Sequence, residues 1–211
     1  IQQKETLGPF YHRFPSLAAL NEQINEKKKS FSPAVREVLA HTLQEQYKAI
    51  NLSDSVKNNI GLLRKDTTFT VVTGHQLNIF TGPLYFIYKI VTVINTCRAL
   101  KEQYPDFDFV PVYWMASEDH DYDEIKTFRL YGKKYTWNTS QQGAVGRFST
   151  SGFDELLREI PGDISVFRKA YKNNKTLAEA VRCYVNELFS NEGVVVIDGD
   201  SKSLKKIFTP V

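Results

Sequence analysis

The sequence predicts an α/β protein with a parallel sheet, and three segments of the chain carry that prediction. Two runs of β-branched and apolar residues, TTFTVV at 67–72 and DFDFVPVYWMA at 106–116, are typical of buried strands. Between them, GPLYFIYKIVTVINTCRALKEQY at 82–104 is apolar on nearly every face and is long enough for a crossover helix. The segment GVVVIDGDSKSLKKIF at 193–208 then repeats the order of strand, turn and helix.

Residues 1–66 are expected to form a helical segment that packs on this core. The run SLAALNEQINEKKKS at 16–30 places its apolar residues at helical spacing. The next helix should begin behind Ser32 as the N-cap, with Pro33 at the first helical position. A shorter helix is expected at 54–64, again behind a capping residue.

Residues 67–125 are expected to form the first half of the core, with strands at 68–73 and 110–114 and a helix that starts at Pro83. Parallel strands deliver the loops that follow them to one edge of the sheet, where α/β proteins bind ligands. The two loops expected at that edge are TGHQLNIFTG and SEDHDYDE.

Residues 126–192 are expected to be an inserted segment, and 193–211 to return to the sheet with a strand at 194–197. The insert should open with a hairpin about Gly132 and Lys133, and GAVGRFST could add another strand. Helices are expected at 153–160, 164–171 and 177–190. Three parallel strands are few for a doubly wound fold, so we expect the chain to be truncated relative to a longer protein.

The composition argues against two classes of partner. The chain has 27 Lys and Arg against 24 Asp and Glu, and a net charge of +3 is too small an excess to predict nucleic-acid binding. No window is as long and apolar as a bilayer span, and the N-terminus lacks a signal-peptide pattern. Cys97 and Cys183 have no bridge or metal spacing, so we interpret them as core thiols of a cytoplasmic protein, with a redox role left open.

The first loop has the composition of an anion-binding turn. Gly74 is expected to turn the chain off the strand, and Thr81 and Gly82 to cap the helix that starts at Pro83. The free N–H groups of such a helix end attract a phosphate or a carboxylate. The neutral donors around it belong to His75, Gln76, Asn78 and Thr81. Strand-to-helix turns contain the same residue types for backbone reasons alone, so both interpretations stay open.

Lys89 supports the interpretation of the first loop as an anion-binding site. It is the only charged residue between Gly82 and Arg98, and it shares a helix face with Tyr85. Helical side chains lean toward the N-terminus, so the ammonium could reach back to the loop. The alternative is a lysine that reaches solvent from a mostly buried helix.

The second loop places six titratable residues within seven positions: Glu118, Asp119, His120, Asp121, Asp123 and Glu124. Such density suits a metal ion, an oriented histidine or a bound amine. The structural alternative is an acidic first turn for a following helix. Six residues cannot all be caps, so we assign Glu118, Asp119 and His120 to the site, and Asp123 and Glu124 to the helix.

Four segments, TGHQLNIFTGPLYFIYK, PVYWMASEDHDYDEI, GAVGRF and ELFSNEGVVVIDGDSKSLKKIF, occur in this order. Together they resemble the bacillithiol biosynthesis family BshC, the cysteine-adding enzyme, and the similarity runs from about Leu7 to the end of the chain. The resemblance implies a Rossmann-like core similar to nucleotidyltransferases and class I aminoacyl-tRNA synthetases. It also implies inserted connecting segments and a C-terminal coiled coil that forms a homodimer, in chains that continue well beyond residue 211.

The resemblance further implies the last step of bacillithiol synthesis, which joins cysteine to the glucosamine amine of glucosaminyl-malate. A carboxylate must be activated before it acylates an amine, so ATP is a possible cofactor. In related nucleotide-binding folds a Gly-His pair after the first strand contacts phosphate, and Gly74 and His75 occupy a similar place. We therefore take His75, Asp119 and His120 as candidate catalytic residues and assign no metal ligand. The candidate substrate-binding residues are Gly74, Gln76, Asn78, Thr81, Gly82, Tyr85, Lys89, Trp114, Ser117 and Glu118.

Two other functions stay open at this point. Metal-assisted hydrolysis by the acidic residues of 118–123 would place a divalent ion among their carboxylates. A module that binds a nucleotide or a thiol metabolite without turnover would use the same loops for recognition alone.

Overall fold

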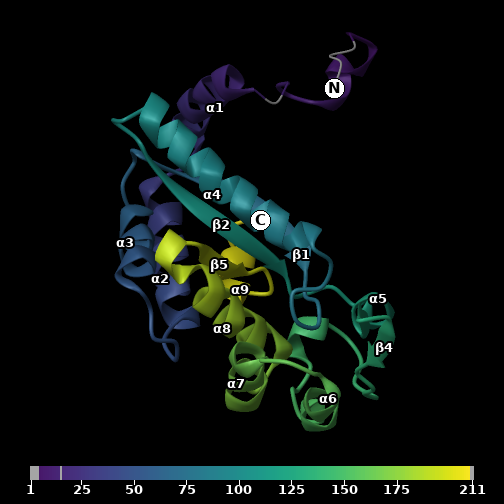
Figure 1. Ribbon diagram of the computed structural model, residues 1–211. Helices are drawn as coiled ribbons and strands as arrows, with labels where there is room; N and C mark the ends of the chain where they lie inside the picture. The colour runs from purple at the N-terminus through teal and green to yellow at the C-terminus, as the bar shows by residue number, and fades with distance from the viewer. Residues whose placement is uncertain (1–4, 15, 210–211) are drawn as a thin grey trace.

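The computed structural model describes residues 5–14 and 16–209, and its centre is a three-stranded parallel sheet (Figure 1). The strand order is β1-β2-β5, with β1 at Thr68–Gln76, β2 at Asp108–Ala116 and β5 at Val195–Asp198. Both neighbouring pairs are parallel, which confirms the predicted sheet. Residues 1–4, 15 and 210–211 lie outside this description, and with them the ends of the first and last predicted segments.

The expected helical segment precedes the sheet. Ser16, Ser32 and Ser53 each accept a hydrogen bond from the backbone N–H three residues further on, so each caps the helix that follows it. None of the helices in the described part of the chain is long and apolar enough to cross a lipid bilayer. The elements of this segment are the 3-10 helix η1 (Glu5–Phe10), α1 (Leu17–Ser30), α2 (Pro33–Gln46) and α3 (Asp54–Leu62).

Helices cover both faces of the central strand β2, which explains why that strand is mostly apolar. The crossover helix α4 (Tyr85–Gln103) lies along one face of β1 and β2, and the ring of Phe86 meets Tyr113 edge-on at 5.2 Å. In Figure 1, α2 and α3 lie on the other side of the sheet from α4. The four consecutive residues 110–113 of β2 are buried, so side chains on both of its faces are covered. A parallel strand buried on both faces has this composition.

The first strand is longer than predicted. It continues through Gly74 and His75 to Gln76, and Gly74 pairs in register with Trp114 of β2. The prediction that Gly74 turns the chain off the strand is therefore wrong. The chain turns later, where Phe80 and Gly82 adopt left-handed φ angles of 57° and 60°.

Helix α4 also begins later than predicted, at Tyr85, and its N-cap Leu84 makes no side-chain capping bond. The expectation that Thr81 caps a helix starting at Pro83 is therefore wrong. Tertiary packing supplies the reason, because the Phe80 N–H donates to the Tyr171 hydroxyl at 2.7 Å and the Tyr184 hydroxyl donates to the Phe80 carbonyl. These contacts hold residues 77–84 as an irregular loop before the helix can start.

The inserted segment opens with the predicted hairpin, an antiparallel pair whose turn contains Tyr131 and Gly132 in left-handed conformations. The turn is one residue earlier than expected. The three helices predicted for the inserted segment are present as α6, α7 and α8. The elements are α5 (Tyr122–Ile125), β3 (Thr127–Leu130), β4 (Lys133–Thr136), the 3-10 helix η2 (Val145–Arg147), α6 (Phe153–Glu159), α7 (Ser165–Asn173), α8 (Leu177–Phe189), the 3-10 helix η3 (Ser190–Glu192) and, after β5, α9 (Lys202–Lys205).

The segment GAVGRFST does not form a strand. It contains η2. Its only β-bridge among the described residues is an isolated one between Ser149 and Thr176. The Gly146 N–H donates to the Ser117 carbonyl at 2.9 Å, and a Cβ on Gly146 would lie 2.5 Å from Ser117 Cβ. This close approach fixes the segment against the end of β2.

Side chains from α2 and the residue after it occupy the outer edge of β5. The Gln46 amide bonds both backbone groups of Asp198, accepting from its N–H at 3.0 Å and donating to its carbonyl at 3.4 Å. The Tyr47 hydroxyl accepts from the Val196 N–H at 2.7 Å. Three backbone groups on this side of the sheet, the N–H of Val196 and both groups of Asp198, are thus satisfied without another strand.

Candidate functional site at the carboxyl ends of the strands

The three parallel strands end at the same level. In the register of the sheet, His75 pairs with Met115, and Met115 pairs with Asp198. The loops that follow the strands therefore meet at one edge, as the sequence predicted for the first two. The third loop, after β5, joins them.

Gln76 connects the first two loops. Its Nε2 atom donates to Asp119 Oδ2 at 2.5 Å and to Glu124 Oε2 at 3.1 Å. The hydrogen bond from Gln76 is the main reason that the pKa of Asp119 lies below its ordinary value, and the bond from the Asp121 N–H adds to it. Asp119 is therefore an anion at neutral pH, held at the end of β1.

Part of the acidic loop has a structural role. Asp121 is the N-cap of α5 and accepts from the Glu124 N–H at 3.1 Å. Asp123 and Glu124 lie in the first turn of that helix, and Asp123 pairs with Lys126. This agrees with the assignment of Asp123 and Glu124 to the helix, although Glu124 also reaches Gln76.

His75 lies between the loop and α4. Its ring stacks on Tyr85, with centroids 5.1 Å apart, and meets Phe86 edge-on at 5.5 Å. Nδ1 lies 3.4 Å from the amide nitrogen of Asn78, whereas Nε2 is buried without a hydrogen-bond partner. Burial and then the charge of Lys89 lower the pKa of His75, so the ring is neutral at pH 7.

Lys89 lies where the sequence placed it. Its ammonium donates to the Gly74 carbonyl at 3.2 Å and lies 5.5 Å from the centre of the Tyr85 ring. Among the described residues it forms no ion pair, so a positive charge without a partner anion lies next to His75. The structure thus brings Gly74, His75, Tyr85 and Lys89 together.

Thr81 and Gly82 have other roles than expected. Thr81 makes no side-chain hydrogen bond to any described residue, and it does not cap α4. A Cβ on Gly82 would lie 2.6 Å from Asn78 Cβ, so this glycine permits close packing of the loop on Asn78.

Ser117 holds the second loop against the third. Its buried hydroxyl donates to Asp198 Oδ1 and accepts from the Asp200 N–H at 3.1 Å. The hydroxyl is thus engaged within the protein. Trp114 of β2 and Glu118 of the loop after it both approach the third loop, because a Cβ on Gly199 would lie 3.0 Å from the indole and 2.7 Å from Glu118 Oε2. That Glu118 oxygen is buried and has no hydrogen-bond partner.

The third loop contains charged residues that were not selected from the sequence. Arg182 of α8 bonds Asp198 at 3.3 Å with its side chain only 5% exposed. Asp200 accepts two bonds from Arg147, at 2.6 and 3.0 Å, and one from Lys205 at 2.7 Å. Arg147 is the main cause of the lowered pKa of Asp200. Their signal was available, because the segment DGDS follows a parallel strand just as the first two loops do.

His120 is separate from this network. Its side chain is exposed, and its ring makes no hydrogen bond to a described residue. In the part of the chain that the structure describes, no three His, Cys, Asp or Glu side chains gather in a way that could hold a metal ion. The arrangement therefore gives no support to metal-assisted hydrolysis by residues 118–123.

Taken together, the site offers two kinds of recognition on one edge. The β1 side presents the neutral imidazole of His75 and the ammonium of Lys89. The β2 side presents the Asp119 carboxylate, and the buried, unpartnered oxygen of Glu118 lies behind it against Gly199. Such a pair of surfaces suits a ligand that carries an anionic and a cationic group, or an amine next to an activated carboxyl.

The comparison with known proteins gives a consistent result. Residues 1–211 match the family model described as "Bacillithiol biosynthesis BshC, N-terminal Rossmann-like domain". A relative named "Putative cysteine ligase BshC" from Cytophaga hutchinsonii is 48% identical over 211 residues, which is 100% of this chain and 40% of the relative. Relatives of the same name from Christiangramia forsetii and Flavobacterium johnsoniae are each 45% identical over 100% of this chain and 42% of their own length. The chain thus spans about two fifths of the length of these curated relatives.

Proposed function

The chain belongs to the bacillithiol biosynthesis BshC family, in which it matches the N-terminal Rossmann-like domain, and from this premise we propose that it supplies part of a ligase active site. The reaction proposed is the joining of cysteine to the amine of glucosaminyl-malate, the last step of bacillithiol synthesis. The names of the relatives support a cysteine ligase, and the two-sided edge of the sheet supports a reaction between an amine and a carboxyl group.

One observation carries the proposal: the hydrogen bond from Gln76 to Asp119 joins the loops of two consecutive strands into one surface. Asp119 stays ionised in that position, and a carboxylate beside an amine can bind its ammonium form or accept its proton. We assign this role to Asp119, with Glu118 Oε2 as the second acceptor for the amine.

His75 and Lys89 are assigned to the anionic group. The unpartnered Nε2 of His75 and the unpaired ammonium of Lys89 fit a phosphate or a carboxylate. These residues would also fit the phosphates of ATP, which supplies, when bound, the activation of the carboxylate that amide formation requires. His75 remains neutral at pH 7, so it can donate a hydrogen bond to an anion or accept a proton.

Further parts of the proposal depend on the family resemblance and on the sequence pattern. We propose that the complete protein is a cytoplasmic homodimer that acts on small molecules. We also propose the division of this chain into 1–66, 67–125, 126–192 and 193–211. His120 is kept as a candidate catalytic residue, although its exposed ring has no contact that supports it.

The test compares Asp119→Asn with the matched control Asp123→Asn in the complete protein. Both changes remove one carboxylate from the same loop, but Asp123 is exposed, pairs only with Lys126 and lies in the first turn of α5. Bacillithiol made by a strain that lacks its own copy of the gene is measured by thiol labelling, and the melting temperature of each purified variant is recorded.

We expect Asp119→Asn to abolish bacillithiol while the purified variant stays folded, with a melting temperature lowered no more than that of Gln76→Ala, and Asp123→Asn to retain it. Normal bacillithiol with Asp119→Asn would overturn the catalytic assignment. If the purified wild-type protein binds both substrates but forms no amide with any nucleotide triphosphate, the protein is a binding module and the ligase proposal fails.

A further inference from the structure

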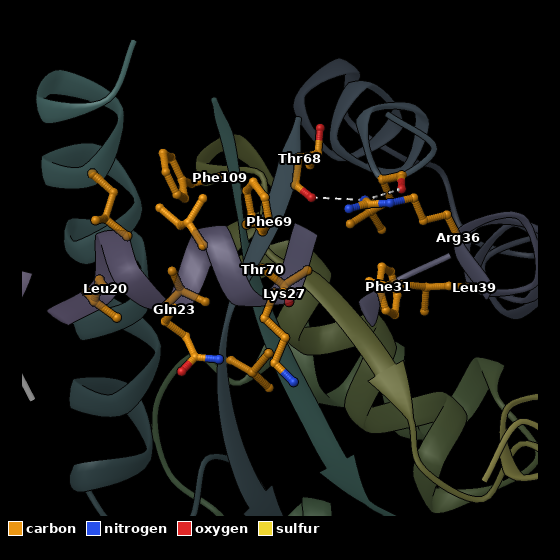
Figure 2. A pocket seen from close by; sticks show the side chains of 15 residues that line it. Leu20, Gln23, Lys27, Phe31, Arg36, Leu39, Thr68, Phe69, Thr70 and Phe109 are labelled. Carbon is orange, nitrogen blue, oxygen red and sulfur yellow. Dashed lines mark hydrogen bonds between the residues drawn. The ribbon is translucent and has the colours of Figure 1, made fainter. Parts of the chain in front are cut away.

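A cavity lies at the end of the sheet opposite to the candidate functional site, at the amino end of β1. It has a volume of about 380 Å³ and lies between α1, α2 and the first residues of β1 (Figure 2). This volume falls in the usual range of small-molecule pockets. Its apolar lining includes Leu20, Ile24, Phe31, Leu39, Phe69 and Phe109.

The charges in this cavity all have one sign. Lys27 and Arg36 are the charged side chains among the described residues that line it, and no aspartate or glutamate does so. Figure 2 shows Arg36 extended toward Thr68 on one side of the cavity and Lys27 on another. The pocket is thus apolar with a positive electrostatic potential, which favours an anion with an apolar body.

Two buried polar atoms in the lining have no partner. Arg36 is 3% exposed, and its Nη1 atom donates to the carbonyls of Leu63 and Thr68 at 3.1 and 2.9 Å, but its Nε atom makes no hydrogen bond. Thr68 is 2% exposed, and its hydroxyl is also unpartnered. Buried donors are normally satisfied, so an unpartnered pair in the wall of a cavity indicates a missing acceptor.

We propose that this cavity is a binding site for an aliphatic carboxylate. The alkyl tail lies among the apolar side chains, and the carboxylate accepts hydrogen bonds from Arg36 and Thr68 and is attracted by Lys27. Arg36 already closes the junction between α3 and β1 through its bonds to backbone carbonyls, and those bonds hold the guanidinium in place without neutralising it.

This site is distinct from the one at the carboxyl ends of the strands. Thr68 begins β1 and Gln76 ends it, so the two sites are separated by eight residue steps, or about 26 Å. None of the residues assigned to the ligase reaction lines the cavity. The inference therefore does not rest on the proposed function.

The experiment measures binding of decanoate to the complete protein by calorimetry, with 1-decanol as the uncharged probe of the same length. Decanoate should bind at least about tenfold more tightly than decanol. Absence of decanoate binding would overturn the proposal, because it would mean that the rest of the protein fills the cavity or that no ligand enters it. Equal binding of the two probes would overturn the assigned carboxylate recognition.

Two variants localise the binding. Thr68→Val keeps the shape of the side chain but removes the hydroxyl, and Lys27→Glu reverses the charge at the wall. Thr68→Val should weaken decanoate binding by about two- to tenfold, as expected for one lost hydrogen bond, without lowering the melting temperature. Lys27→Glu should weaken it more in low salt than in high salt.

Lys29→Glu is the matched control, because Lys29 lies on the same helix but does not line the cavity. It should leave the affinity unchanged. Equal losses in Lys27→Glu and Lys29→Glu, or full affinity in Thr68→Val, would place decanoate elsewhere and refute the site.

Discussion

The side-chain amide of Gln76 bridges two carboxylates, donating to Asp119 at 2.5 Å and to Glu124 at 3.1 Å. One neutral residue at the end of β1 thereby fixes the position of the acidic loop that follows β2. Because Gln76 is also the main cause of the lowered pKa of Asp119, the contact sets both the geometry and the charge of the candidate site.

Gln76→Ala should raise the pKa of Asp119 toward its ordinary value. A carboxyl whose pKa is lowered by folding stabilises the protein above its unfolded-state pKa, and this stabilisation is lost as the pH falls through the lowered value. The variant should therefore be less stable than wild type at pH 7, with a smaller further loss between about pH 4 and pH 2. Denaturant unfolding of the complete protein across this range measures the difference. Gln44→Ala, which removes a surface contact to Arg64, is the control. It should leave the loss of stability between about pH 4 and pH 2 the same as in wild type.

Lys89→Met should raise the pKa of His75, because the charge of Lys89 is the second cause of its lowering after burial. A histidine whose folded-state pKa lies below its unfolded value destabilises the protein as the pH falls below about 6.5. The variant should therefore lose less stability than wild type between pH 7 and pH 5. The pKa of His75 is measured directly by following its imidazole NMR signals through a pH titration. Lys57→Met, on the exposed part of α3, should not move the His75 resonance, and an unmoved resonance in Lys89→Met would contradict the prediction.

Gly199→Ala should destabilise the protein by about 1–3 kcal/mol, the usual cost of overpacking. Its Cβ would lie 2.7 Å from Glu118 Oε2 and 2.9 Å from the Met115 carbonyl, so Glu118 must move. The matched control is Gly61→Ala in α3, where nothing lies within 4 Å of the added atom. That change should stabilise the helix by about 0.5–1 kcal/mol. Equal unfolding free energies for the two variants would refute the close approach of the second and third loops.

Arg182→Met should cost about 3–5 kcal/mol, because it leaves the Asp198 carboxylate without its cation in a mostly buried position. Arg98→Met breaks an ion pair with Glu192 in which both side chains are exposed, and its cost should be below about 1 kcal/mol. Chemical unfolding of the two variants in parallel provides the comparison. A small effect of Arg182→Met would mean that Asp198 does not depend on this ion pair and that the third loop is not fixed as described.

The sequence allowed the parallel sheet to be predicted because each strand is rich in β-branched and apolar residues and each is followed by turn residues. The same rule placed the Gly74 to Gln76 segment and the Glu118 to His120 segment at one edge. Helical spacing likewise placed Lys89 near Gly74, which the 3.2 Å hydrogen bond confirms. The local sequence pattern was sufficient for these predictions, because residues close in the sequence determine where a strand ends and which side chains share a helix face.

The wrong predictions concern features that distant residues determine. The start of α4 depends on Tyr171 and Tyr184, which bond Phe80 from α7 and α8, about a hundred residues away. The course of GAVGRFST depends on the contact of Gly146 with Ser117. The partner of Asp198 is Arg182, a helical residue whose spacing marks only a buried face. No local signal in Thr81 or Gly146 reports these contacts.

The bonds of Gln46 and Tyr47 to the backbone of β5 have a consequence for how the sheet can grow. An unpaired strand edge is a template for another chain, and natural proteins block such edges to avoid aggregation. On the β5 side, an amide and a phenol take the positions that a neighbouring strand would need, and among the described residues no strand pairs with the outer side of β1. Beside β1, Arg36 and Lys89 donate to the carbonyls of Thr68 and Gly74, so only the stretch 70–72 between them is left for an added strand to pair with.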